Sequence, residues 1–250
     1  MSSLTSLSGL TSLSCCFDAS VTPFPIAQLP CLKSLELEAA SPRFDLMFLL
    51  NQPCSSLERL CLGKSVELQS LPHAMGELMP CLRELIINEC ESLAHLPGGF
   101  TSLRALQRLT ISRCKMTSLP GTFGRLPALT FLSLGLPELT HLPDSFRLLT
   151  ALKILNLVDC ESLSELPPSL GDLTALESLS IVNSPRLMLS ESIGDMTNLK
   201  SFHLNEVSTL RYSELPSSLS RLSSPTSLQI FQSVLSWLPE GMGKLSQLCQ

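Results

Sequence analysis

Residues 81–103 read CLRELIINECESLAHLPGGFTSL, and residues 151–174 read ALKILNLVDCESLSELPPSLGDLT. In both stretches, leucine-class residues fall at the same offsets from an opening leucine, which is Leu82 in one and Leu152 in the other. The same offsets recur from positions 106, 129, 176 and 199, so the six opening positions are spaced by 24, 23, 23, 24 and 23 residues. An interval this regular indicates one structural unit repeated along the chain.

The repeat extends outward with more variation. Earlier copies open at Leu57, Leu32 and Leu10, and the last full copy opens at Pro225, which makes about ten copies of 23–26 residues. Two copies, near residues 32–56 and 199–224, are irregular. We therefore expect residues 1–250 to form a single domain. Because the chain begins and ends inside a copy, we also expect it to be a fragment of a longer protein, or else to have its open ends covered by a partner.

Each copy encodes one strand followed by a short return segment. Leu85 and Ile87 alternate with Ile86, which is the period of a strand with one buried face. Neighbouring copies then stack their strands in parallel about 4.8 Å apart. Proline suits the first position of a short helical turn, because its nitrogen needs no hydrogen-bond partner. A Leu-Pro step, or Phe-Pro in the first copy, begins the return at Pro25, Pro72, Pro97, Pro120, Pro143, Pro167, Pro216 and Pro239.

These features predict an α/β solenoid shaped like a horseshoe. Its parallel sheet would lie on the concave face, and short helical or 3₁₀ turns and loops would lie on the convex face. No single copy can bury its own leucines, so the stability should come from stacking between neighbours.

The pattern LxxLxLxxCxxLxxLPxxhGxL, with Cys90 and Cys160 at the cysteine position, resembles the leucine-rich-repeat domains of plant intracellular immune receptors of the nucleotide-binding type. The resemblance implies a cytoplasmic recognition module that senses a pathogen effector or a host signalling protein. The phosphate-binding loop G-x-x-x-x-G-K-[ST] is absent from the sequence, so only the sensor part of such a receptor would be present. A stand-alone intracellular scaffold of the Ras-group-related leucine-rich-repeat class is the alternative.

Composition narrows the function further. The net charge of −5 gives no electrostatic footprint for nucleic acid or for an anionic membrane. His95 and His141 occupy the same slot two copies apart, about 10 Å from each other by the strand spacing, which is too far to share a metal ion. Cys90, Cys114 and Cys160 are repeat-equivalent, which favours structural thiols over a catalytic one. We expect no enzyme activity, no cofactor and no metal, and a protein as the partner.

The outward-facing positions of the strands should carry the specificity. Two sets of residues alternate in charge across three adjacent copies: Arg59–Glu84–Arg108 and Lys64–Glu89–Arg113. They read either as two ladders of cross-strand ion pairs or as part of a binding surface.

Apolar residues lie beside these charges at outward positions. An aromatic and aliphatic cluster flanked by charge is typical of a binding hot spot, whereas drift on a leucine-rich template is the alternative. We predict that a partner docks on this part of the concave face. The predicted contact residues are Glu84, Ile86, Glu89, Arg108, Arg113, Phe131, Leu136, Ile154, Val158 and Val182.

Overall fold

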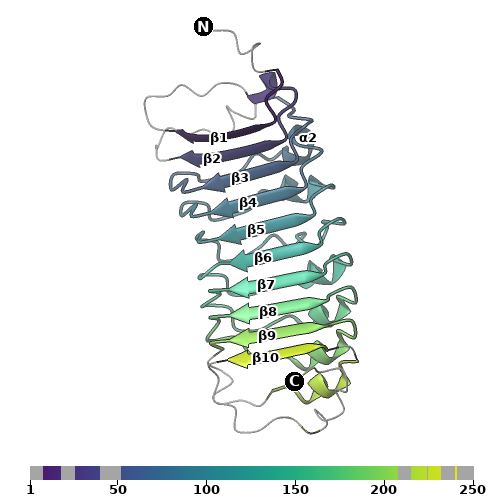
Figure 1. The fold of residues 1–250 in the computed structure, drawn as a ribbon. Coiled ribbons are helices and arrows are strands. Elements are labelled where there is room, and N and C mark those ends of the chain that lie inside the picture. The colour runs from purple at the N-terminus through teal and green to yellow at the C-terminus, as the bar shows by residue number, and fades with distance from the viewer. Residues whose placement is uncertain are drawn as a thin grey trace.

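A computed structural model describes residues 8–17, 26–39, 52–207, 215–223, 225–231 and 240. These residues form one sheet of ten parallel strands that lie in chain order (Figure 1). The predicted solenoid and the parallel pairing of its copies are confirmed. The strands are β1 (Ser12–Phe17), β2 (Ser34–Ala39), β3 (Arg59–Gly63), β4 (Glu84–Asn88), β5 (Arg108–Ser112), β6 (Phe131–Gly135), β7 (Ile154–Val158), β8 (Ser178–Val182), β9 (Ser201–Asn205) and β10 (Ser227–Phe231).

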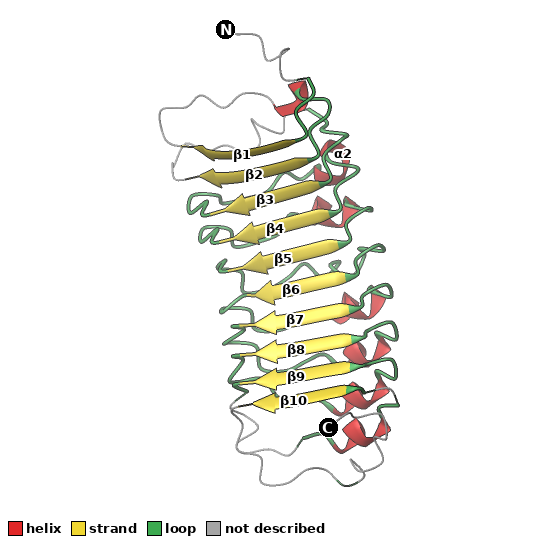
Figure 2. Cartoon of the chain, viewed as in Figure 1, coloured by secondary structure: helices red, strands yellow, loops and turns green. Residues whose placement is uncertain are grey.

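Short helical segments form a second layer on one side of the sheet (Figure 2). One is an α-helical turn and the others are 3₁₀ helices, as expected for returns that contain only a few residues. They are η2 (Ile26–Gln28), α2 (Met75–Leu78), η3 (Gly98–Ser102), η4 (Asp144–Leu148), η5 (Pro168–Asp172), η6 (Glu191–Asp195) and η8 (Ser217–Arg221). Parts of both irregular copies, at residues 40–51 and 208–214, lie outside the described residues.

The core fills the space between the two layers. In β7, Leu155 and Leu157 are fully buried, whereas Ile154, Asn156 and Val158 are only half-buried. The same alternation runs through β4 and β8. We refer to the sheet surface on the side away from the core as the open face.

A Leu-Pro step begins most of the returns. Pro97, Pro143, Pro167 and Pro216 have φ between −53° and −72° and directly precede their 3₁₀ helices. The carbonyl of Pro97 accepts a hydrogen bond from the N–H of Phe100 at 3.0 Å. These prolines therefore cap the helix, one position earlier than predicted, because the proline carbonyl closes the first turn. Pro25 and Pro239 lie outside the described residues.

Side chains three positions after each cap stack along the solenoid. The rings of Phe100 and Phe123 lie 6.2 Å apart with an interplanar angle of 11°, and those of Phe123 and Phe146 lie 5.3 Å apart at 14°. Leu170 and Ile193 continue the column, and all five side chains are fully buried. Each copy therefore adds one layer to a continuous apolar column.

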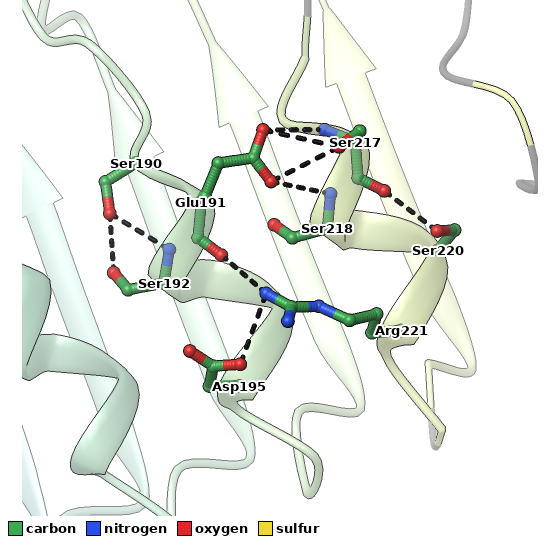
Figure 3. A network of polar contacts seen from close by, with 8 residues as sticks. All are labelled: Ser190, Glu191, Ser192, Asp195, Ser217, Ser218, Ser220 and Arg221. Atoms are coloured by element: carbon green, nitrogen blue, oxygen red, sulfur yellow. Dashed lines mark hydrogen bonds and ion pairs between the residues drawn. The ribbon is translucent and has the colours of Figure 1, made fainter.

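The copy that contains η6 has Ser190 where the others have proline. Its Oγ accepts a hydrogen bond from the N–H of Ser192 at 3.1 Å, which is a side-chain N-cap. Glu191 accepts hydrogen bonds from the N–H groups of Ser217 and Ser218, at 3.1 and 2.9 Å, at the start of η8 (Figure 3). These bonds tie two neighbouring copies together on the helical side.

In five copies, the buried slot two residues after the strand holds a small polar side chain that reaches backbone carbonyls: Ser65, Cys90, Cys114, Cys160 and Ser184. Cys160 Sγ donates to the carbonyl of Leu134 at 3.5 Å, and Cys90 Sγ donates to that of Leu62 at 3.8 Å. Ser65 and Ser184 bond in a similar way to the carbonyl two residues before them. The structural role predicted for these thiols is confirmed.

Within the described ranges, the helical segments are too short and insufficiently apolar to cross a membrane.

Candidate functional site

The open face is built from rows of side chains, because paired residues of adjacent strands point the same way. One row begins the strands and runs from Arg59 through Glu84, Arg108 and Phe131 to Ile154. These positions are exposed or half-buried, so the strand register predicted from the sequence is correct here.

Charged residues occupy the part of this row on β3, β4 and β5. Arg59 Nε lies 2.8 Å from Glu84 Oε2, and Arg108 Nε lies 3.3 Å from Glu84 Oε1. One carboxylate thus binds two guanidinium groups, and the first predicted ladder of ion pairs is confirmed. Ile86, in the next row on β4, is half-buried on the open face as predicted.

The second ladder is only partly correct. Arg113 Nη1 binds Glu89 Oε1 at 2.7 Å, as predicted. Lys64 Nζ, however, binds Glu38 of β2 at 3.1 Å instead of Glu89. The flexible lysine reaches either neighbouring copy, and Glu89 already has a guanidinium partner.

A cation–π contact joins the charged part of the face to the apolar part. The guanidinium carbon of Arg108 lies 4.2 Å from the centre of the Phe131 ring. Arginine over an aromatic face is favourable even where both groups remain hydrated at the edge. The contact holds Phe131 at the border between β5 and β6.

Apolar side chains occupy the open face of β6, β7 and β8. Phe131, Ile154, Val158 and Val182 are all half-buried there, as predicted. We call these four residues the apolar patch. A polar row made of Ser133, Asn156 and Ser180 runs between its two halves.

Leu136 was predicted to belong to this patch, and that prediction is wrong. Leu136 is fully buried. Its carbonyl accepts a hydrogen bond from the N–H of Leu139 at 3.2 Å, just as the carbonyl of Cys160 accepts one from Leu163. The copy that opens at Leu129 has one residue fewer after its strand. That deletion moves Leu136 into the buried slot that Cys160 fills in the next copy.

A further group of residues on the open face was missed. Phe231 is 51% exposed, and its ring meets His203 edge-on at 5.7 Å. His203 Nε2 and Asn205 Oδ1 are buried and have no hydrogen-bond partner among the described residues. Phe231 stands six residues after the opening Pro225, as Val158 stands six after Leu152. Comparing that offset across all copies would have identified it.

The repeat-equivalent thiols of Cys90, Cys114 and Cys160 are buried. Burial raises the pKa of the Cys160 thiol, and hydrogen bonding to Cys114 together with burial raises that of Cys90. A nucleophilic cysteine needs a lowered pKa and an accessible sulfur. The hydrogen bond with the Cys90 side chain lowers the pKa of Cys114, but Cys114 is only 2% exposed. His95 and His141 are exposed. Among the described residues, no group of three or more His, Cys, Asp or Glu side chains is placed to hold a metal ion.

Solved structures share this architecture. The leucine-rich-repeat domain of the type III effector XopL superposes with a TM-score of 0.71 at 24% identity, over 92% of this chain and 79% of that domain. TLR13, solved in a complex with ssRNA13, gives 0.65 at 24% identity over 88% and 32% of the two chains. Internalin C2 of Listeria monocytogenes gives 0.61 at 21% identity over 78% and 80%. At these identities the likeness shows the fold.

No curated protein sequence matches the chain significantly. The profile of a protein family described as a leucine-rich repeat region matches residues 82–249, which is more than half of the 250 residues. The chain belongs to the leucine-rich-repeat proteins.

Proposed function

We propose that the open face from β4 to β8 recognises another protein. The observation that carries the proposal is the apolar patch beside a charged ladder, joined by the contact of Arg108 with Phe131 at 4.2 Å. Apolar side chains that face water on a sheet mark interaction sites, and hot spots are rich in aromatic and arginine residues.

Protein is a better partner for this face than nucleic acid. TLR13 was solved with ssRNA13, so the fold also occurs in a protein that binds RNA. In this chain, however, Arg59 and Arg108 both bind Glu84, and Arg113 binds Glu89. Each of these three arginines thus already has a carboxylate partner, and the net charge is −5. A phosphate backbone would gain little from such a surface.

The experiment is a quantitative comparison of the proteins retained from source cells by the wild type and by Phe131→Glu. We expect at least one protein to be retained by the wild type and lost by the variant. Val66→Glu is the matched control, because Val66 is 43% exposed but lies in the loop after β3, away from the patch. If both variants and the wild type retain the same proteins, the apolar patch is not the recognition surface.

At a finer level, we propose a cytoplasmic recognition module of a plant-type intracellular immune receptor. The partner would be a pathogen effector, a host signalling protein or another domain of the same full-length chain. The support is the repeat itself, with cysteine in the buried slot of three copies and a Leu-Pro step before most returns. A stand-alone signalling scaffold is the second candidate, because scaffolds of the Ras-group-related class carry the same L-P-x-x-h-G-x-L return.

Sequencing of the complete transcript separates these two roles. A reading frame that encodes a G-x-x-x-x-G-K-[ST] loop upstream of the repeats supports the receptor. A complete frame without that loop overturns the receptor role and favours the scaffold.

A further inference from the structure

We refer to the edge of the open face at the carboxyl ends of the strands as the rim. One residue that other copies have at this rim is missing after β6. In six described copies, the residue that follows the strand has a positive φ, between 49° and 57°, and projects a polar side chain at the rim: Lys64, Glu89, Arg113, Asp159, Asn183 and Glu206. Each donates its N–H to the last strand residue of the next copy. The copy of β6 has no such residue, because buried Leu136 follows Gly135 directly.

The missing residue leaves a carbonyl without its usual donor. In neighbouring copies, the carbonyls of Gly135 and Val182 accept hydrogen bonds from Arg113 and Asp159, at 2.8 and 3.0 Å. The carbonyl of Val158 is the equivalent acceptor for the copy of β6. Among the described residues, it receives only the weak thiol contact from Cys160 at 3.7 Å. A backbone acceptor of this kind is available to an N–H group of a ligand.

Opposite charges flank this position. On one side, after β5, are Arg113, which pairs with Glu89 at 2.7 Å but keeps a side chain that is 70% exposed, and Lys115, which is exposed and forms no ion pair with any described residue. On the other side, after β7, is Asp159, whose Oδ1 accepts a hydrogen bond from Asn183 at 2.8 Å. Exposed Glu161 lies two residues further on and likewise has no ion-pair partner in the described part of the chain. The side chains named after β5 are therefore basic, and those named after β7 are acidic.

The spacing of these charges matches an extended peptide. Arg113 and Asp159 follow strands that are two places apart in the sheet, so they are separated by about 10 Å. An extended chain advances about 3.4 Å per residue, so residues three apart also span about 10 Å. Val158 and Val182 of the apolar patch lie beside this rim, on the last row of β7 and β8.

We infer that the rim between β5 and β7 binds a short extended segment of a partner protein, in which an acidic residue faces Arg113 and a basic residue three positions away faces Asp159. An apolar side chain between them packs on Val158, and a main-chain N–H of the segment donates to the carbonyl of Val158. The inference rests on the proposed function and specifies the chemistry of the partner.

The test is selection of phage-displayed random decapeptides on the wild type and on two single variants, Arg113→Glu and Asp159→Lys. Both variants introduce at this slot a residue type that other copies already hold there, Glu89 and Lys64, so the fold should be kept. The wild type should select an acid and a base three positions apart with an apolar residue between them. Arg113→Glu should select a base at both flanks, and Asp159→Lys an acid at both.

Wild-type peptides should bind each variant about tenfold more weakly or worse, because like charges then face each other across the contact. Lys64→Glu is the matched control. It reverses a charge in the same slot after β3 and should select the wild-type pattern.

Several outcomes overturn the inference: no peptide enriched on the wild type, the same charge pattern on all four proteins, or a requirement for polyanions such as single-stranded RNA. Phe131→Glu separates this failure from that of the proposed function. If Phe131→Glu abolishes peptide binding while Arg113→Glu and Asp159→Lys do not change it, the rim site is contradicted. The apolar patch would still be supported as a recognition surface.

Discussion

Strands β5 and β6 pair residue for residue, yet they present opposite chemistry to solvent. Toward the core both strands place only aliphatic side chains, such as Leu109 and Leu132, which are fully buried. Toward the open face, β5 begins with Arg108 and β6 begins with Phe131. An inward side chain is confined by the copies on both sides and must match their volume. An outward side chain has no such constraint, so the outward differences are the ones that report on function.

The largest expected difference in unfolding free energy is between substitutions of two adjacent residues of β7. Leu155→Ala should lower the free energy of unfolding by about 2–5 kcal/mol, because Leu155 is fully buried and truncation leaves a cavity. Ile154→Ala, on the open face, should cost about 1 kcal/mol or less. Denaturant unfolding of both variants measures the difference. Equal losses would show that the two faces of the strand are not distinct in packing.

A second test addresses the helical side, where copies are in close contact. A methyl group added at Gly124 would overlap the backbone carbonyl of Ser145 in the next copy. Gly124→Ala should therefore cost about 1–3 kcal/mol, since the copies must move apart. Gly121→Ala is the control, because nothing lies within 4 Å of a methyl group there. Similar unfolding free energies for the two variants would contradict this packing.

The sequence predicts the position of a residue correctly only when its offset is measured from a reference residue with no deletion in between. Offsets from the opening leucine correctly placed Phe131 and Ile154, because the strand is never interrupted. They misplaced Leu136, because the deletion lies between the strand and the return. Counted back from the proline, Leu136 precedes Pro143 by seven residues, as Cys160 precedes Pro167, which is the buried slot. The choice of Lys64 between two carboxylates could not be predicted, because a long side chain reaches both neighbouring copies.

A third test asks how much the charged ladder contributes to stability. A double-mutant cycle of Arg59→Ala and Glu84→Ala should give a coupling energy of about 0.2–1 kcal/mol that decreases with added salt, since both groups are partly exposed. Thermal or denaturant unfolding of the four proteins provides the measurement. A coupling well above this range would mean that the ladder is a structural element and that its outward position carries no information about binding.

The smallest expected effect is on the helical side, at Glu191 (Figure 3). The backbone N–H of Ser218 holds the pKa of the Glu191 carboxyl below its ordinary value. A lowered folded-state pKa stabilises the protein above the ordinary value of 4.5, and the contribution is lost as the pH falls through the lowered pKa. Glu191→Gln should thus destabilise by about 0.5 kcal/mol at pH 7. The difference from the wild type should shrink as the pH falls below 4.5 and through the lowered pKa.

Unfolding curves of Glu191→Gln at several pH values test this prediction. Glu138→Gln is the control, because it removes an exposed carboxylate that forms no ion pair with the described residues. A pH-independent difference for Glu191→Gln would show that its charge is not what stabilises η8.

Phe131 and Leu136 lie only five residues apart, yet Phe131 is on the open face and Leu136 is in the core. The copy of β6 is one residue shorter after its strand, and this deletion moves Leu136 inward. Denaturant unfolding of Phe131→Glu and Leu136→Glu tests this placement most directly. We predict that Phe131→Glu stays cooperative and within about 1 kcal/mol of the wild type, because only exposed contacts change. Leu136→Glu should lose cooperative unfolding, because it buries an unpaired carboxylate. A folded Leu136→Glu as stable as Phe131→Glu would contradict the account.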